Sequence, residues 1–232
     1  MYDLHIHSSY SDGVNTPEEI VLAGIELGYA EIAVCDHVRA TTDWFDSFYA
    51  EMERLKKKYE GRITVYSAVE AKVTPEGLDI RPEFYLADYV FAALHTFPGD
   101  KVEAFKVMLE SPADGIVHPF RGLSDKEARE IIPLLLEYGK PLEVSAKYFS
   151  EHYESLKGRV PLFVGSDSHS VEEMYTGGVT MGDIIFDEST KLIIKEETVE
   201  EEKKDESVGG SVSPGRRGFG MRRHNREARR KR

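Results

Sequence analysis

Histidine and acidic residues recur along the first 170 residues at positions where they can bind metal ions. His5 and His7 are two residues apart, which places both imidazoles on one face of an extended strand and Ile6 on the other. Asp167 and His169 repeat this spacing with a carboxylate and an imidazole. Imidazole combined with carboxylate suits Zn²⁺, Mn²⁺ or Fe better than Ca²⁺, which prefers oxygen ligands. The full set of expected ligands is His5, His7, Asp12, His37, Glu70, His95, His118, Asp167 and His169.

Six imidazoles and three carboxylates exceed what one metal ion uses, since a single ion takes about four to six ligands. The sequence therefore predicts two or three divalent metal ions, with Glu70 as a bridge between two of them. Neighbouring metals generate a nucleophile from water and neutralise phosphoryl oxygens, so the predicted chemistry is phosphate ester cleavage by a metal-activated hydroxide. The alternative for any single histidine is a hydrogen-bonded structural role, and Asp12 can instead shape the turn with Ser11 and Gly13.

The positions of these residues depend on the predicted strands and helices. Short β-branched runs alternate with amphipathic stretches, a pattern typical of parallel βαβ units. We expect strands at 2–7, 31–37, 63–71, 89–95, 115–119, 141–146 and 161–166, and helices at 17–27, 43–59, 101–110, 125–137 and 149–156. Seven strands favour a distorted (β/α)7 TIM-like barrel, and an open doubly wound sheet is the alternative. Glu70 and six histidines come at or just after strand carboxyl ends, where the active sites of such barrels form.

The strand and helix pattern also predicts the roles of several residues outside the expected metal site. Thr16, Pro17 and Glu19 form a helix start signal with a capping box. Cys35 is expected to face the core. His152 and His224 lie off the pattern and are expected not to bind metal.

Two arginines follow expected ligands closely enough to bind a phosphate. Arg39 comes two residues after His37, and Arg121 comes three residues after His118. For each, a solvated loop arginine is the alternative. Lys147 and Tyr148, after another strand end, are less favoured candidates.

The charge of the chain is unevenly distributed. The net charge is −12, but residues 209–232 hold nine Lys/Arg and one acid, and residues 195–206 hold seven acids and three lysines. The remaining body then carries −16, which disfavours broad polyanion binding. We expect a catalytic barrel at 1–195 and a disordered tail at 196–232, acidic and then basic, because so few apolar groups cannot offset the entropy of ordering.

The sequence also indicates the cellular compartment in which the protein is expected. A single cysteine excludes a disulfide framework within the chain and fits a cytoplasmic protein. We expect neither a secretory signal nor a membrane span. The sequence does not predict an oligomeric state.

Three segments resemble motifs of the PHP (polymerase and histidinol phosphatase) superfamily over roughly residues 1–170. Residues 3–13 resemble its first motif, residues 35–37 its second and residues 166–169 its last, while Glu70 and His95 match its middle ligands. The resemblance implies a distorted seven-stranded barrel with three metals. One metal would be bound by His5, His7, Glu70 and Asp167, the second by Glu70, His95 and His118, and the third by Asp12, His37 and His169. Some family members have histidine where Asp12 stands.

The resemblance implies hydrolysis of a phosphate ester and leaves three functions open. The first is a phosphatase for a small phosphorylated substrate, of the histidinol phosphate or nucleotide type. The second is a nuclease or 3′-end exonuclease on DNA or RNA, with nucleic acid bound through the Arg-rich tail. The third is a non-catalytic scaffold barrel for RNA processing. Glu70, Asp12 and His169 are the expected catalytic side chains, and Asp12 or His169 is an alternative to a metal-bound water as donor to the leaving oxygen.

Overall fold

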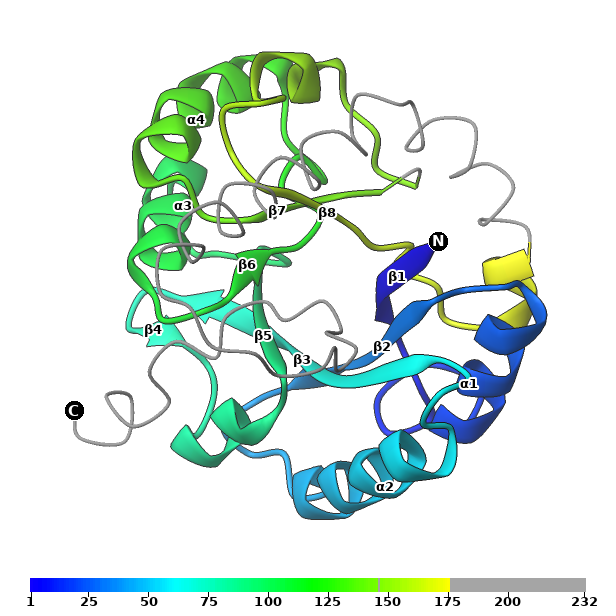
Figure 1. Cartoon of the computed structure of the whole chain (residues 1–232). Helices are drawn as coiled ribbons and strands as arrows, with labels where there is room; N and C mark the ends of the chain where they lie inside the picture. Colours follow the sequence, from blue (N-terminus) through cyan, green and yellow to red (C-terminus); the bar gives the residue numbers. More distant parts are fainter. Residues whose placement is uncertain (146, 176–232) are drawn as a thin grey trace, which may run out of the picture. The chain divides into compact units, whose positions relative to one another are not determined.

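Seven parallel strands form the centre of the fold in the computed structural model, which describes residues 1–145 and 147–175 (Figure 1). Neighbouring strands follow the order β1-β2-β3-β5-β6-β7-β8. Their bounds are β1 Tyr2–Ile6, β2 Glu31–Val38, β3 Thr64–Thr74, β5 Tyr89–Ala93, β6 Gly115–Ile116, β7 Leu142–Val144 and β8 Leu162–Val164. A short strand, β4 (Gly77–Leu78), pairs antiparallel with the end of β3.

The sheet curls until its two edges approach each other. Ile6 at the end of β1 forms an isolated parallel bridge with Ser168, which follows β8. The backbone N–H of His7 donates to the carbonyl of Ser168 at 2.8 Å, and that of Asp167 donates to the carbonyl of His5 at 2.9 Å. This arrangement confirms the predicted distorted TIM-like barrel over an open doubly wound sheet.

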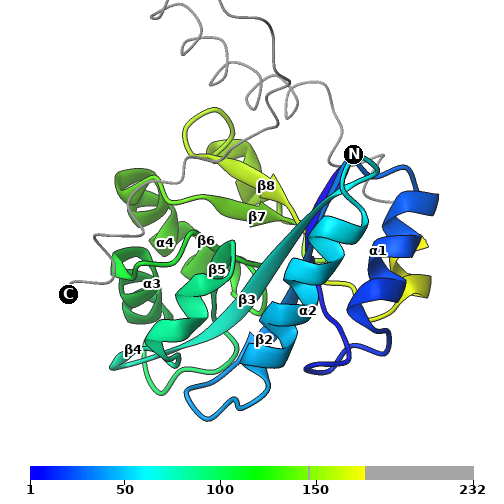
Figure 2. The same cartoon turned by 60° about the horizontal axis from the view of Figure 1, so that its bottom comes forward.

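Four α-helices lie outside the curled sheet, as expected for parallel βαβ units (Figure 2). They are α1 Pro17–Glu26, α2 Phe45–Lys58, α3 Lys101–Glu110 and α4 Asp125–Tyr138. The described residues also contain two 3₁₀ helices, η1 Pro82–Leu86 and η2 Glu151–Ser155, and a helical segment at 171–175. The capping box expected at the start of α1 is present: Thr16 Oγ1 accepts from the N–H of Glu19, whose carboxylate accepts from the N–H of Thr16. None of the helices in the described ranges is long and apolar enough to cross a membrane.

Side chains alternate between the two faces of each strand, so every second residue faces the barrel interior, and the last of these residues lie at the mouth of the barrel. Cys35, Ala68 and Ala93 are buried in the cluster that fills the barrel interior, and the buried position of Cys35 confirms the expectation for it. Two residues further along the same strand faces come His37, Glu70 and His95. Val69, which lies between Ala68 and Glu70, and Val34, which precedes Cys35, pack in the cluster under the helices instead. The alternation of side chains that forms the core therefore also directs His37, Glu70 and His95 to the mouth of the barrel.

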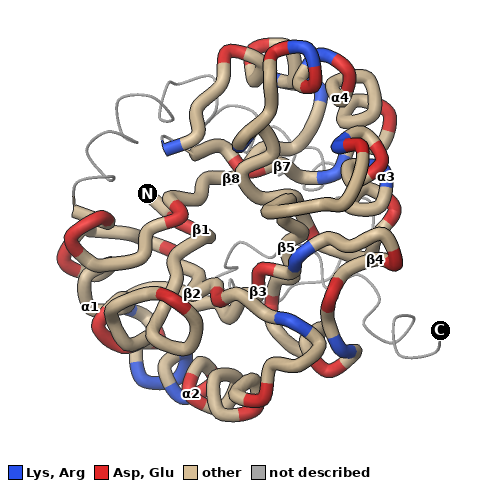
Figure 3. Tube along the Cα trace, turned by 180° about the vertical axis from the view of Figure 1, so that it is seen from behind, with Lys and Arg blue, Asp and Glu red and all other residues tan. Residues whose placement is uncertain are grey.

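Several elements differ from the sequence-based expectation. β6 ends at Ile116 and β8 at Val164, short of the expected ends at 119 and 166. His118 and Asp167, which follow these strands, have positive φ angles of 33° and 55° and are not extended. The helix expected at 149–156 is the 3₁₀ helix η2, and β4 and η1 were not expected. The tail expected at 196–232 lies outside the described residues. Acidic positions are distributed around the ring of helices (Figure 3).

Candidate metal centre

The nine expected metal ligands lie together at the carboxyl-terminal end of the strands. Three groups of them place ligand atoms within 4.8 Å of one another. The groups are His5, His7 and Asp167; His37, Glu70 and His95; and His7, Asp12, His37 and His169. His118 joins the second group, since its Nε2 lies 2.9 Å from Glu70 Oε1.

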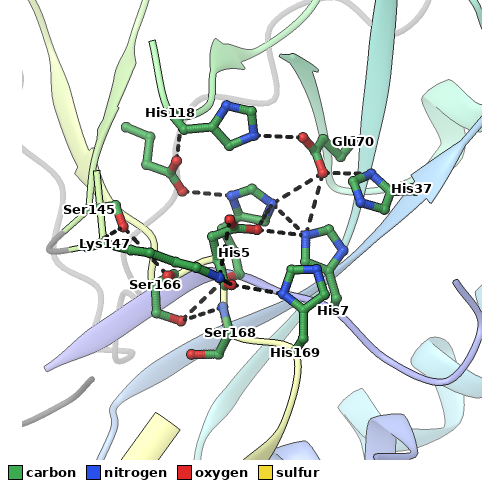
Figure 4. Close-up of polar contacts among 12 residues, drawn as sticks. His5, His7, His37, Glu70, His118, Ser145, Lys147, Ser166, Ser168 and His169 are labelled. Atoms are coloured by element: carbon green, nitrogen blue, oxygen red, sulfur yellow. Dashed lines mark hydrogen bonds and ion pairs between the residues drawn. The ribbon is translucent and has the colours of Figure 1, made fainter. Parts of the chain in front are cut away.

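The first group is fully buried. His5 Nε2 and His7 Nε2 are 3.0 Å apart, and Asp167 Oδ1 lies 3.0 Å from His7 Nε2. Burial lowers the pKa of His7, whereas the pKa of His5 is raised well above its usual value because Glu143 and Glu70 outweigh the burial of its ring. Burial disfavours the Asp167 carboxylate, but His7 and His5 still lower its pKa. Figure 4 shows His5, His7 and Glu70 pointing toward one another.

Glu70 occupies the centre of the site and is completely buried. Its Oε1 lies 3.0 Å from His95 Nε2, and its Oε2 lies 2.8 Å from His37 Nδ1 and 3.4 Å from His7 Nε2. Burial alone would raise the pKa of this carboxyl group, but hydrogen bonds from the surrounding histidines hold it well below its usual value. Glu70 is thus an ionised carboxylate shared among several imidazoles, the position of a bridging ligand.

Asp12 reaches the site from the loop that follows β1. Its Oδ2 lies 3.3 Å from His37 Nε2 and 3.5 Å from His169 Nε2, while the side chain remains 52% exposed. Burial opposes ionisation, but the neighbouring histidines lower the pKa of Asp12. Gly13 allows the loop to fold back tightly, because a Cβ there would lie 2.2 Å from the carbonyl oxygen of His7.

The chemistry of the donor set fits divalent cations. Glu70 Oε2 and ring nitrogens of His7, His37, His95 and His118 are buried without a well-directed hydrogen bond, although Glu70 Oε2 lies close to His37 Nδ1. Such orphaned polar atoms are costly in a folded protein unless an ion or another group satisfies them. His118 and Asp167 also hold the left-handed backbone conformation that non-glycine residues rarely adopt, a form of strain that clusters at functional sites. Imidazole and carboxylate together are the preferred donors of transition metals.

The positively charged side chains at the rim of the site differ in their interaction partners. A cavity of about 570 Å³ is lined by expected ligands and by Arg39, Arg121, Lys147, Tyr148 and Glu173. Arg39 donates to the carbonyl of Val38 at 2.6 Å and lies 4.0 Å from Asp79. Lys147 Nζ donates to the carbonyl of Asp167 at 3.0 Å. Arg121 lies over the Tyr148 ring, 5.1 Å from its centroid, and no carboxylate of the described residues pairs with it.

The sequence did not single out two buried carboxylates beside the site. Asp36 accepts from the N–H of Ser8 at 2.9 Å, from Ser8 Oγ at 2.6 Å and from Ser11 Oγ at 2.5 Å, and so holds the loop that carries Asp12. Glu143 contacts His5. The available signal was an acidic residue inside an otherwise apolar strand, as in Leu142–Val144.

Two histidines were expected not to bind metal, and one of them lies among the described residues. His152 Nε2 lies 3.1 Å from Asp125 Oδ1 and belongs to none of the three groups. His224 lies outside the described residues.

Solved structures with the same fold include two histidinol phosphatases. The structure of histidinol phosphate phosphatase from Lactococcus lactis, complexed with Zn, L-histidinol and phosphate, gives a TM-score of 0.55 at 19% identity and covers 78% of this chain and 92% of that one. That of a putative histidinol phosphatase from Listeria monocytogenes gives 0.55 at 18% identity, covering 78% and 99%. At these identities the likeness shows a shared fold.

Sequence comparisons agree with the fold. The chain is 26% identical to the DNA polymerase/3′-5′ exonuclease PolX of Bacillus subtilis over 75% of its own length, and it spans only 36% of that relative. The model of the PHP domain matches residues 3–194. The chain therefore belongs to the PHP domain family, as its motifs implied.

Proposed function

We propose that this protein hydrolyses phosphate monoesters of small metabolites, of the histidinol phosphate or nucleotide type, in a metal-dependent reaction. The observation that carries the proposal is the convergence of six imidazoles and three carboxylates from separate strand ends at one mouth. The histidinol phosphatase from Lactococcus lactis has the same fold and was solved with Zn, L-histidinol and phosphate, which supports the same class of chemistry here.

The residues divide into those that hold metal and those that bind substrate. His5, His7, Glu70 and Asp167 would hold one cation; Glu70, His95 and His118 a second; and Asp12, His37 and His169 a third. Divalent cations supply charge neutralisation of phosphoryl oxygens and favour ionisation of water near neutrality. Zn²⁺ is supported by the Lactococcus neighbour, and the donor set is equally suited to Mn²⁺ or Fe.

Other side chains orient the phosphate and handle protons. Arg121 lies at the rim with an uncompensated charge, which suits a phosphate oxygen. Arg39 is a second such group, although a carbonyl and Asp79 already engage it. The lowered pKa of Asp12 keeps its carboxylate ionised and without a proton to donate, so of the two expected donors His169 is the remaining candidate to protonate the leaving oxygen.

The size and charge of the surroundings favour a small substrate. A cavity of about 570 Å³ is within the range of small-molecule sites. The acidic body of the chain repels an extended polyanion, whereas cations inside the mouth attract a compact one.

The decisive experiment is a phosphatase screen of the full-length protein with Zn²⁺ or Mn²⁺. The panel contains histidinol phosphate, nucleoside mono- and bisphosphates, an aryl phosphate and short oligonucleotides. We expect release of inorganic phosphate from one or more small monoesters, and loss of this activity after treatment with a chelator. Full activity after verified removal of metal, or no hydrolysis with any divalent metal, would refute the proposal.

A second candidate function is 3′-end trimming of DNA or RNA, favoured by the similarity to the PolX exonuclease. The acidic body makes the basic segment 209–232 the expected contact for nucleic acid. Replacing Arg222, Arg223, Arg229 and Arg230 by Ser should then reduce oligonucleotide cleavage and leave aryl phosphate hydrolysis unchanged. Equal cleavage by both forms would argue against this function.

A further inference from the structure

The buried Glu143 on β7 has one carboxylate oxygen on each of two expected metal ligands. Its Oε1 lies 2.7 Å from His5 Nδ1, and its Oε2 accepts from the backbone N–H of His118 at 2.6 Å. The side chain is completely buried. His5 belongs to the first group of ligands and His118 contacts Glu70 in the second, so one carboxylate touches both groups.

We infer that Glu143 is a positioning residue that fixes His5 and His118 together and so sets the metal affinity of two neighbouring sites. The inference rests on the metal centre in the proposed function. Each contact has a distinct effect. The contact to Nδ1 holds the proton of a neutral His5 on that nitrogen and leaves Nε2, which faces His7, free to bind a cation.

The contact to His118 fixes a strained turn. His118 has a φ angle of 33°, and its N–H is directed at Glu143 rather than at a neighbouring strand. A residue in this region of φ,ψ space needs compensating interactions to remain there. The turn also directs the imidazole of His118 toward Glu70, and His118 Nε2 lies 2.9 Å from Glu70 Oε1. Figure 4 shows the imidazole of His118 pointing toward Glu70.

The neighbouring strand leaves room for this carboxylate. A Cβ atom at Gly165 would lie 1.9 Å from Glu143 Oε1 and 2.7 Å from His5 Cβ. Any larger residue would therefore displace the carboxylate or the ring, so glycine at 165 is required by the Glu143–His5 contact.

Glu143→Gln tests the inference with little change in shape. A carboxylate accepts a hydrogen bond on each oxygen, whereas an amide accepts on one side and donates on the other. Glutamine therefore either faces the His118 N–H with its NH₂ group or forces the proton of His5 onto Nε2. Affinity for Zn²⁺ is measured on the full-length protein by competition with a chromophoric chelator. We expect a loss of about 10- to 100-fold, typical when a residue that orients a ligand is changed.

A matched control separates orientation from general stability. The Tyr153 hydroxyl donates to the backbone carbonyl of Glu143 at 2.7 Å, so Tyr153→Phe weakens the same strand and leaves the carboxylate intact. We expect Tyr153→Phe to lower the urea midpoint of the metal-free protein while Zn²⁺ affinity stays within a factor of about 2. Should Glu143→Gln not fold, Glu143→Asp keeps the charge and shortens the reach by one methylene, and the same loss of affinity is expected.

The outcomes distinguish this inference from the function itself. Wild-type affinity in Glu143→Gln, or in Glu143→Asp where that variant is used, overturns the positioning role. An equal loss of affinity in Tyr153→Phe does so too, because a structural effect then explains both. If the wild-type protein binds no Zn²⁺, Mn²⁺ or Fe, the proposed metal centre is itself refuted, and the inference with it.

Discussion

His5 and His7 face each other with their Nε2 atoms 3.0 Å apart in the buried mouth of the barrel. Asp167 Oδ1 lies at the same distance from His7 Nε2. Two imidazole lone pairs repel each other at this separation unless a proton or a metal cation lies between them. The raised pKa of His5, which Glu143 and Glu70 maintain against the effect of burial, shows how strongly the surroundings favour positive charge here. A cation at this place satisfies both rings and the carboxylate at once.

Removal of metal should therefore destabilise the fold as well as abolish activity. A ligand that binds only the native state stabilises it by about 3 kcal/mol when its free concentration is 100 times Kd. For a chain of this size, 1 kcal/mol shifts Tm by roughly 2–4 °C, so we expect chelation to lower Tm by about 6–12 °C. Thermal unfolding followed by circular dichroism, before and after chelation, measures the shift. Zn²⁺ should restore Tm and Ca²⁺ should not; an unchanged Tm in metal-free protein would contradict the prediction.

Glu70→Gln should remove the shared carboxylate while preserving its shape. His37, His95 and His118 all lie within 3.0 Å of the two oxygens, so the loss of charge affects every group at once. We expect kcat/KM to fall by at least about 10³-fold, equivalent to several kcal/mol of lost transition-state stabilisation, and bound metal to decrease. Metal content is measured by atomic emission. Glu76→Gln, the same change on the exposed turn before β4, should keep full activity. Wild-type activity and metal content in Glu70→Gln would exclude the bridging role.

The sequence predicted the convergence of these side chains because strand periodicity directs them to the mouth of the barrel. His37, Glu70 and His95 each follow an interior apolar residue by two positions, so the pattern that identifies the strand also gives the direction of its last side chain. The start of α1 was predicted for a similarly local reason, since Thr16, Pro17 and Glu19 act within one turn.

The features that were missed depend on contacts between distant segments. Glu143 is 138 residues from His5, and although its place inside an apolar strand indicates burial, nothing near it in the sequence shows which side chain its carboxylate contacts. Asp36 similarly accepts from serines more than 24 residues away. His118 left its predicted strand at 115–119 because tertiary contacts hold it at positive φ, against local preference.

The two rim arginines should contribute unequally to substrate binding. Arg121 has no carboxylate partner among the described residues, whereas Arg39 is engaged by a carbonyl and by Asp79. We expect Arg121→Met to raise KM for a monoester by about tenfold or more, since a charge-assisted hydrogen bond contributes about 1.5–3 kcal/mol, and Arg39→Met to have a smaller effect. Steady-state kinetics on one monoester compares them. Arg129→Met, on the exposed surface of α4, is the control, and a larger effect at Arg39 than at Arg121 would reverse the assignment.

Acid should weaken a contact between the first two helices in a defined pH range. Glu18 on α1 accepts from Arg54 Nη2 at 2.9 Å, from the Tyr59 hydroxyl at 2.7 Å and from Lys58. The hydrogen bonds from Lys58, Arg54 and Tyr59 lower the pKa of Glu18 from 4.5 to about 2. Because the folded-state pKa is the lower one, the stabilisation is complete above pH 4.5 and is lost as the pH falls toward 2.

Glu18→Gln tests this directly. The variant should lower the free energy of unfolding at pH 7 by about 1 kcal/mol, the upper range for a partly exposed ion pair. The difference from wild type should shrink between pH 4.5 and pH 2, because protonation removes the same charge from the wild-type protein. Urea unfolding of both metal-free proteins at pH 7, 4 and 3 measures it, and Glu76→Gln should show no such trend. A difference that stays constant with pH would mean that the Glu18 contacts stabilise the helices by packing rather than by charge.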